Sequence, residues 1–256
     1  TGSTSGIGLA VAEKFADNGF DLIVHGGKSH AKLDAALQQL SHRAGNCLGF
    51  LADFCEREKL QSRIDEAWQW QGRIDVLVNN AGIDLVTEQH DLSMASKSEL
   101  LWKVDVVSTM EISQLVGQRM RDRASSLESP AGQYSIINIG WDQAYQGMAG
   151  DSGILFSSSK GAIMSMTKSL AQTLAPEIRV NCVAPGWIKT KWSESASDYW
   201  QTRAKQESLM ERWGTPEDVA AAVYFLASPQ SSFVSGQILN VNGGFCYHRE
   251  SEPTSD

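Results

Sequence analysis

Short apolar runs alternate with helix-type patterns along the chain, and this alternation constrains the fold more than any other feature. Five runs are continuous and rich in β-branched or large apolar residues: Phe20–His25, Cys47–Ala52, Ile74–Asn79, Tyr134–Ile139 and Arg179–Ala184. Such runs are typical of strands in a parallel sheet that helices cover on both faces. The stretches between them carry helical patterns: Gly8–Asn18, Ala31–Arg43, Arg57–Gln71, Lys97–Arg123, Gly161–Leu174 and Glu217–Leu226. The alternation predicts a doubly wound α/β fold with a mostly parallel sheet in three layers.

The length of the chain fits one domain with a substantial core. Of its 256 residues, 1–248 are expected to form a single domain and 249–256 a polar tail. A glycine-rich turn occupies residues 1–8, and a turn of this kind normally follows a β-strand. We therefore expect a first strand upstream of Thr1.

Charge and cysteine content exclude several classes of partner. The formal net charge is -8 with acids and bases interspersed, so neither nucleic acid nor a membrane surface is expected to bind. No stretch is apolar for long enough to cross a bilayer. The four cysteines, Cys47, Cys55, Cys182 and Cys246, form no CxxC pair, which favours a reducing, cytoplasmic setting and argues against a metal site.

The opening residues Thr1–Gly8 read TGSTSGIG, with glycines at positions 2, 6 and 8. Glycines permit a tight turn and let the backbone approach a pyrophosphate, and the helix that follows points its N-terminal amides at the anion. This pattern predicts a Rossmann-type dinucleotide-binding domain.

Further motifs follow the glycine turn in a recognisable order: Asp53, Asn79-Asn80-Ala81-Gly82, Lys160, Pro185-Gly186 and Gly243-Gly244. Together with TGxxxGIG they resemble the short-chain dehydrogenase/reductase family, and within it the 3-oxoacyl-ACP reductases. The resemblance covers essentially the whole chain and implies a nicotinamide dinucleotide cofactor.

The resemblance also assigns cofactor contacts by position. It implies that the turn residues Gly2, Ser3, Thr4, Ser5, Gly6, Ile7 and Gly8 surround the phosphates and the adenosine ribose. It places Asp53 and Phe54 at the adenine, and Asn79, Ala81 and Gly82 along the ribose side. Facing the nicotinamide amide it places Pro185, Gly186, Ile188 and Thr190.

The end of the second expected strand bears on the choice between NAD and NADP. An acid at this point binds the ribose 2′-hydroxyl and repels a 2′-phosphate, and here the chain reads His25-Gly26-Gly27-Lys28-Ser29 without one. Lys28 and Ser29 can instead donate to a 2′-phosphate. We therefore expect NADP(H) as the preferred cofactor, with NAD(H) possible.

The family's proton-transfer residues are mostly absent. In the family a tyrosine lies four residues before the lysine, and the nearby ammonium lowers the phenol pKa from about 10 toward the working pH. Counting back from Lys160 gives Phe156, which carries no proton. Trp141 stands where the resemblance implies a serine, and Asp105 where it implies an asparagine.

Two explanations remain open. In the first the site is rebuilt, with Tyr145 taking over the phenol's role beside Lys160, or with Asp142 or Asp105 relaying a proton through water. In the second the domain binds its cofactor without redox chemistry. Lys160 keeps its ribose contact in either case.

Residues 187–213 correspond to the family's substrate lid and hold four tryptophans, including Trp187 and Trp192. With Trp141 and Phe156 expected opposite, this aromatic density favours a small, flat or apolar substrate. Small residues at 157–162 permit close helix approach, and family members commonly pair through this helix, so we expect a homodimer or homotetramer.

The leading interpretation is an NADP(H)-dependent oxidoreductase that transfers a hydride between nicotinamide and a carbonyl or alcohol. The alternative is a non-catalytic dinucleotide-binding sensor or assembly protein. A third possibility is a lyase or isomerase that uses the cofactor only for structure.

Overall fold

Parallel strands form the middle layer of the computed structural model, which describes residues 1–85, 91–128 and 132–246. In chain order the strands are β1 (Leu22–Gly26), β2 (Cys47–Leu51), β3 (Val76–Asn79), β4 (Tyr134–Ile139), β5 (Ile178–Pro185) and β6 (Ile238–Val241). Every pairing is parallel: β1 with β2, and β3, β4, β5 and β6 in that order. The carboxyl ends of these strands therefore point the same way, and the functional residues follow them.

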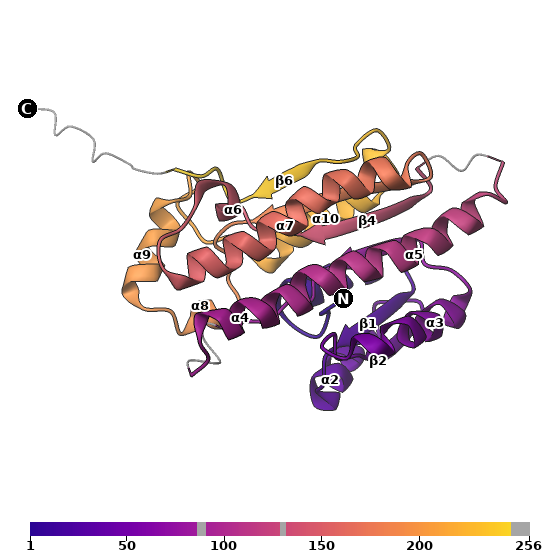
Figure 1. The fold of residues 1–256 in the computed structure, drawn as a ribbon, viewed down its shortest axis with the longest axis horizontal. Helices are drawn as coiled ribbons and strands as arrows, with labels where there is room; N and C mark the ends of the chain where they lie inside the picture. Colours follow the sequence, from indigo (N-terminus) through magenta and orange to yellow (C-terminus); the bar gives the residue numbers. More distant parts are fainter. Residues whose placement is uncertain (86–90, 129–131, 247–256) are drawn as a thin grey trace, which may run out of the picture.

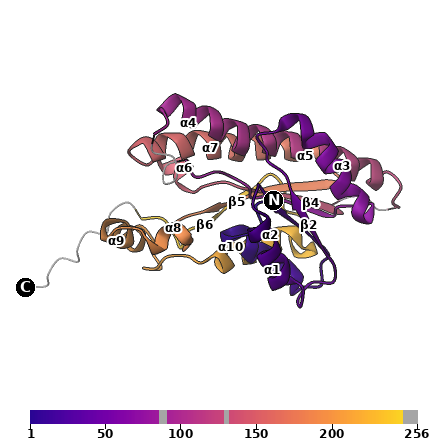
Figure 2. The same ribbon diagram turned by 90° about the horizontal axis from the view of Figure 1, so that it is seen from below.

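Helices cover both faces of the sheet (Figures 1 and 2). One face carries α3 (Leu60–Gln71), α4 (Met94–Leu101), α5 (Ser108–Ala124) and α7 (Asp151–Leu174). The other carries α1 (Gly6–Ala16), α2 (His30–Leu40) and α10 (Pro216–Ala227). Shorter helices lie near one end of the molecule: α6 (Gln143–Gln146), α8 (Lys191–Glu194) and α9 (Asp198–Gln206). The predicted three-layer fold is confirmed.

Burial explains why the central strands are apolar on both sides. Every residue of β4 and β5 is buried. Ile136 and Val180 belong to the core beneath α5 and α7, whereas Ile137 and Val183 belong to the core beneath α1 and α10. The continuous apolar runs in the sequence reflect this double coverage.

The sheet is divided between β1 and β3, which do not pair with each other. A cavity of about 660 Å³ lies between them, lined in part by Phe15, Val78, Ile112 and Val116. The single-domain organisation stays a prediction. The expected tail 249–256 lies outside the described residues.

Several elements differ from the sequence-based prediction, and the largest differences concern α7, α4–α5 and β6. The helix predicted to begin at Gly161 begins at Asp151, because tertiary packing of Leu155 and Ser159 outweighs the weak helix propensity of a serine- and glycine-rich stretch. The predicted helix Lys97–Arg123 consists of α4, the π-helical turn η2 (Trp102–Val107) and α5. The strand β6 was not predicted. No helix in the described part combines the length and hydropathy needed to span a bilayer.

Candidate cofactor and active site

The glycine turn lies tightly against the segment that follows β3. Gly2 has φ +64°, and a Cβ there would lie 2.8 Å from the Ala81 Cα. A Cβ on Gly8 would lie 2.1 Å from the Gly2 carbonyl oxygen. The Asn80 amide nitrogen donates to the carbonyl oxygens of Thr1 at 3.2 Å and Gly2 at 3.1 Å. Only glycine fits at positions 2 and 8, so the sequence motif is explained by close packing.

His25, at the end of β1, holds the same turn from the other side. The Gly2 amide donates to His25 Nδ1 at 3.0 Å, and His25 Nε2 lies 3.0 Å from the Ala52 carbonyl oxygen. These partners assign the hydrogen to Nε2 of a neutral imidazole. The ring stacks on Phe54 with centroids 4.5 Å apart. Burial lowers the pKa of His25 to about 4, so the ring is neutral near pH 7.

The first turn of α1 is open to an anion. Its N-cap, Ser5, makes no side-chain capping hydrogen bond, and the first turn contains no acidic residue. The amides of Gly6, Ile7 and Gly8 have no intrahelical acceptor because they belong to the first turn. Together with the positive end of the helix dipole, they suit a pyrophosphate. The residues present therefore fit the phosphates of a dinucleotide.

The residues expected at the adenosine end interact with one another. Lys28 forms an ion pair with Asp53 at 2.9 Å, and the lysine side chain is 79% exposed. Burial raises the pKa of Asp53, but hydrogen bonds from Lys28 and the Cys55 amide outweigh it, and the net effect lowers the pKa. Ser29 caps α2 by accepting from the Lys32 amide. Lys28 is thus exposed to solvent although it is paired, and the Ser29 hydroxyl, which accepts from Lys32, can still donate a hydrogen bond.

The motif after β3 separates into structural and site-facing residues. Asn79 is buried, and its amide nitrogen donates to Ser113 Oγ at 2.9 Å and Asn138 Oδ1 at 2.8 Å. These bonds tie β3 to α5 and β4. Gly82 lies beside Asp105, where a Cβ would be 3.0 Å from Oδ2. The motif therefore connects the glycine turn to Asp105, one of the predicted catalytic residues.

Lys160 and Asp105 form a buried ion pair. Lys160 Nζ lies 3.1 Å from Asp105 Oδ2, and the side chains are 15% and 1% exposed. Asp105 Oδ1 accepts from the Ile83 amide at 3.1 Å. Asp105 lies within η2, and π-helical turns are frequent at functional sites. The structure thus brings together two of the four predicted catalytic residues.

Trp141 and Phe156, which are predicted to replace the family's serine and tyrosine, pack against each other. Their rings meet edge to face with centroids 6.2 Å apart. Phe156 also packs against the cluster of Leu85, Leu101 and Leu155. The two rings are in mutual contact and supply no proton donor at these positions.

Asp142 is buried beneath the segment that follows β5. Asp142 is only 1% exposed, and its Oδ2 accepts a hydrogen bond from Asn242 Nδ2 at 3.0 Å. Oδ1 is buried and has no hydrogen-bond partner. Burial, only partly offset by hydrogen bonds that include the one from Asn242, raises the pKa of Asp142 to about 6. This carboxyl group therefore exchanges a proton near neutral pH.

Tyr145 lies on α6 and is 58% exposed. Within the described residues no hydrogen bond joins its hydroxyl to Lys160, whose ion-pair partner is Asp105. The geometry therefore gives less support to Tyr145 than to Asp142 or Asp105 as a proton carrier.

The lid, residues 187–213, begins directly beside the glycine turn. A Cβ on Gly6 would lie 3.9 Å from Thr190 Cγ2, so the two segments are neighbours. Ile188 is buried in the core, and Thr190 caps α8 through a capping box with Ser193. The Gly186 amide donates to the Val241 carbonyl at 3.0 Å. The predicted nicotinamide-facing residues are therefore fixed by β6 and by the lid itself.

The lid tryptophans form one cluster. The Trp187 ring lies 6.3 Å from Trp192, 5.5 Å from Trp200 and 5.9 Å from Trp213, centroid to centroid. Trp213 is buried. Much of the aromatic surface predicted to face substrate is therefore covered within the lid.

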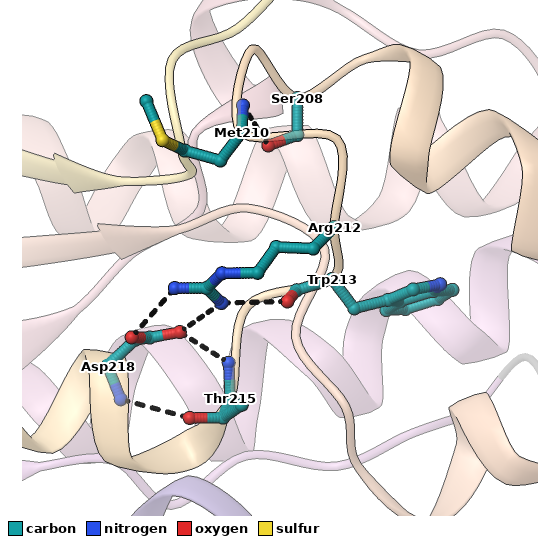
Figure 3. A network of polar contacts seen from close by, with 6 residues as sticks. All are labelled: Ser208, Met210, Arg212, Trp213, Thr215 and Asp218. Carbon is teal, nitrogen blue, oxygen red and sulfur yellow. Dashed lines mark hydrogen bonds and ion pairs between the residues drawn. The ribbon is translucent and has the colours of Figure 1, made fainter.

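The far end of the lid is anchored to α10 (Figure 3). Arg212 Nη1 donates to Asp218 Oδ2 at 2.7 Å and to the Trp213 carbonyl at 2.9 Å. Asp218 also completes a capping box with Thr215. The ion pair with Arg212 lowers the pKa of Asp218.

No group of metal-binding side chains occurs in the described part of the chain.

Comparison with known proteins agrees with this geometry. Residues 2–246 match a family model described as enoyl-(acyl carrier protein) reductase. The chain is 32% identical to the 3-oxoacyl-[acyl-carrier-protein] reductase FabG of Aquifex aeolicus, over 95% of this chain and 94% of that protein. The chain belongs to the short-chain dehydrogenase/reductase family. It is an oxidoreductase of this family, whose members bind nicotinamide cofactors.

Other members of the family show how varied its substrates are. Glucose 1-dehydrogenase 2 of Bacillus subtilis is 31% identical over 95% of this chain and 92% of its own. A 7α-hydroxysteroid dehydrogenase solved with NADH and 7-oxo glycochenodeoxycholic acid has a TM-score of 0.84 and 29% identity, covering 97% of this chain and 93% of that chain. ElxO with NADP bound has a TM-score of 0.80 and 27% identity, covering 95% of each chain.

Sequence reasoning missed four residues that organise the site. Asn80 and His25 hold the glycine turn, Asn242 holds Asp142, and Glu207 binds the lid tryptophan Trp187. Asn80 had a signal, because it lies in the Asn79–Gly82 motif. The other three act through contacts between residues far apart in the chain, which a single sequence does not display.

Proposed function

We propose that this short-chain dehydrogenase/reductase is an NADP(H)-dependent oxidoreductase that reduces the carbonyl group of a small, flat or apolar compound. The proposal is carried by the uncapped first turn of α1, which follows a glycine turn held between Asn80 and His25 and leaves its amides available to phosphates. When bound, the reduced nicotinamide supplies a hydride. Lys160 would contact the nicotinamide ribose, with Asp105 fixing the position of its ammonium group.

Reduction of a carbonyl also requires a proton, which Phe156 cannot supply. Two groups are the leading candidates for its donor: the Lys160 ammonium paired with Asp105, and the Asp142 carboxyl, whose pKa of about 6 leaves it partly protonated near neutral pH. Tyr145 is a third candidate. In this arrangement Trp141 and Phe156 exclude water from the reacting carbonyl and pack against the apolar part of the substrate. Trp187 and Trp192 close the site from the lid.

Cofactor preference follows from charge at the end of β1. Residues 26–29 include no carboxylate. Lys28 is exposed and can give up its ion pair with Asp53 to bind a 2′-phosphate. We expect NADPH to bind more tightly than NADH. Lys28→Ala should reduce NADPH affinity by roughly fivefold, the modest loss expected for a solvent-exposed ion pair, and leave NADH affinity unchanged. Equal losses for both cofactors would contradict this assignment.

A direct experiment tests the function. NADPH absorbance is followed during incubation with ketones, quinones and 3-oxoacyl thioesters. Turnover that is abolished by Lys160→Ala and by Asp142→Asn, but retained by Tyr145→Phe, supports the mechanism. If Asp142→Asn retains turnover, the proton donor is the Lys160–Asp105 pair. If Tyr145→Phe loses turnover, Tyr145 takes part in proton transfer.

A second function is favoured by one observation. The contact between Trp141 and Phe156 places two rings where the family has hydroxyl groups, which suits a protein that binds the dinucleotide as a sensor or assembly partner. Tight NADPH binding without turnover of any compound in the panel would support this second function.

We also propose that the chain forms a homodimer or homotetramer through α5 and α7. Apolar side chains are exposed on and next to these helices: Trp102, Met110 and Ile154 are 46%, 39% and 58% exposed. A Cβ on Gly161 meets nothing within 4 Å, so this part of α7 is open to a neighbour. Ile154→Asp should shift the sedimentation coefficient toward that of a monomer.

A further inference from the structure

Glu207, the residue after α9, collects hydrogen bonds from three parts of the chain. Its carboxylate is 15% exposed. Trp187 Nε1 donates to Oε2 at 2.7 Å, and Arg203 Nε donates to Oε1 at 2.7 Å. Gln143 Nε2, from the loop after β4, donates to Oε2 at 3.4 Å. One side chain therefore contacts the start of the lid, the end of the lid and the loop that carries Trp141 and Asp142.

These contacts fix the orientation of the Trp187 ring. The Arg203 guanidinium lies 5.7 Å from the Trp187 ring centroid and 5.3 Å from that of Trp200, within cation–π range. Glu207 orients this guanidinium and also accepts from the indole nitrogen. Trp187 directly follows Gly186, so the end of the nicotinamide-facing segment moves with Glu207.

A second connection runs through the segment 242–246. The Cys246 amide donates to the Glu207 carbonyl at 3.0 Å, and the Leu209 amide donates to the Gly244 carbonyl at 2.8 Å. Asn242, at the start of the same segment, donates to Asp142. The lid end and Asp142 are thus both bonded to one short stretch of chain.

Loss of the Glu207 carboxylate affects both connected parts. It leaves the Trp187 N–H and the Gln143 amide nitrogen without their acceptor, and Gln143 is 1% exposed. Buried donors without acceptors are costly, so both segments gain by opening to water. The other polar atom of this side chain, Gln143 Oε1, already lacks a hydrogen-bond partner. The side chain of Gln143 therefore depends on Glu207 for its hydrogen bonding.

We infer that Glu207 is a positioning residue that couples the lid to the loop after β4, so that the two segments open and close together. The inference rests on the proposed function, because the loop carries Asp142 and Trp141 while the lid covers the nicotinamide end. Lid closure and the placement of Asp142 are then one event rather than two.

Hydrogen exchange of the whole chain without cofactor tests the coupling. Glu207→Ala removes the acceptor of the Trp187, Arg203 and Gln143 hydrogen bonds. It should therefore raise amide exchange in the lid peptides 187–206 and in the loop peptides 141–147 by a similar factor of about tenfold or more. Glu194→Ala serves as the matched control, because Glu194 is an exposed acid on α8 in the same lid. It should leave exchange in both segments unchanged.

Gln143→Leu gives the reciprocal measurement if Glu207→Ala does not fold. This variant removes only the loop side of the connection and should also raise exchange in the lid. The coupling is refuted if Glu207→Ala loosens the lid alone or Gln143→Leu loosens the loop alone. Stopped-flow measurements should show that NADPH dissociates severalfold faster from Glu207→Ala than from the unaltered chain. This result separates loss of the coupling from failure of the proposed function, because in the second case the unaltered chain itself would bind no NADPH.

Discussion

Replacing His25 tests whether a neutral imidazole holds the glycine turn. The ring is buried at the end of β1, accepts from Gly2 and donates to Ala52. Burial lowers its pKa from 6.5 to about 4. Below pH 6.5 the unfolded chain therefore binds a proton that the folded chain does not. The contribution of His25 to stability is complete above pH 6.5 and is lost as the pH falls to about 4.

The size of the effect follows from the shift. A change from 6.5 to about 4 corresponds to about 3 kcal/mol when each pKa unit is worth roughly 1.4 kcal/mol. At pH 5 only part of this is lost, about 2 kcal/mol relative to pH 7. Asp142 acts in the opposite direction, because its pKa is raised from 3.8 to about 6 and its contribution is lost as the pH rises. The pH dependence of the free energy of unfolding therefore contains contributions from both His25 and Asp142.

Urea unfolding of the unaltered chain and of His25→Gln separates them. The free energies of unfolding are measured at pH 7, 6 and 5, and the contribution of Asp142 cancels in the difference between the two proteins. The unaltered chain should be the more stable at pH 7, and its advantage should shrink by about 2 kcal/mol at pH 5. An advantage that stays constant across this range would show that His25 is not held neutral by burial.

Three further predictions concern single contacts. Gly8→Ala should abolish measurable NADPH binding by fluorescence titration, because its Cβ would lie 2.1 Å from a carbonyl oxygen, whereas Gly161→Ala meets nothing within 4 Å and should bind normally. Arg179→Met should lower the free energy of unfolding in urea by about 2–4 kcal/mol, since the buried guanidinium donates to carbonyl groups at the end of α10; a loss below 1 kcal/mol would contradict this. Asp105→Leu should cost about 3–5 kcal/mol by leaving the Lys160 ammonium unpaired, and Lys160→Met in the same chain should recover part of that loss.

The sequence predicts those parts of the fold that depend on local pattern. Tyr134–Ile139 is found as a strand with the predicted bounds, because every one of its residues is buried and large apolar side chains dominate the run. The glycine turn can be predicted equally well, because the backbone packs so closely at Gly2 and Gly8 that no side chain fits there. Family membership follows from such motifs taken together.

Contacts between distant segments were harder to predict. The beginning of α7 at Asp151 depends on packing of Leu155, and the role of His25 depends on two backbone groups that are not its neighbours in the chain. Tyr145 and Asp142 lie three residues apart and looked equivalent as proton carriers. The structure distinguishes them by burial, with Tyr145 58% and Asp142 1% exposed.

The wide turn η2 has a consequence for how this part of the chain tolerates change. A π-helical turn contains more residues than an α-helical turn. The residues of α5 are therefore rotated about the helix axis, relative to α4, from where one continuous α-helix would put them. Deletion of one residue between 102 and 107 would restore the α-helical repeat and rotate everything that follows by about 100°. Either Asp105 would then leave Lys160, or the apolar side of α5 would turn away from the sheet. Insertions and deletions here should therefore be far less tolerated than substitutions at the exposed positions of the same helix.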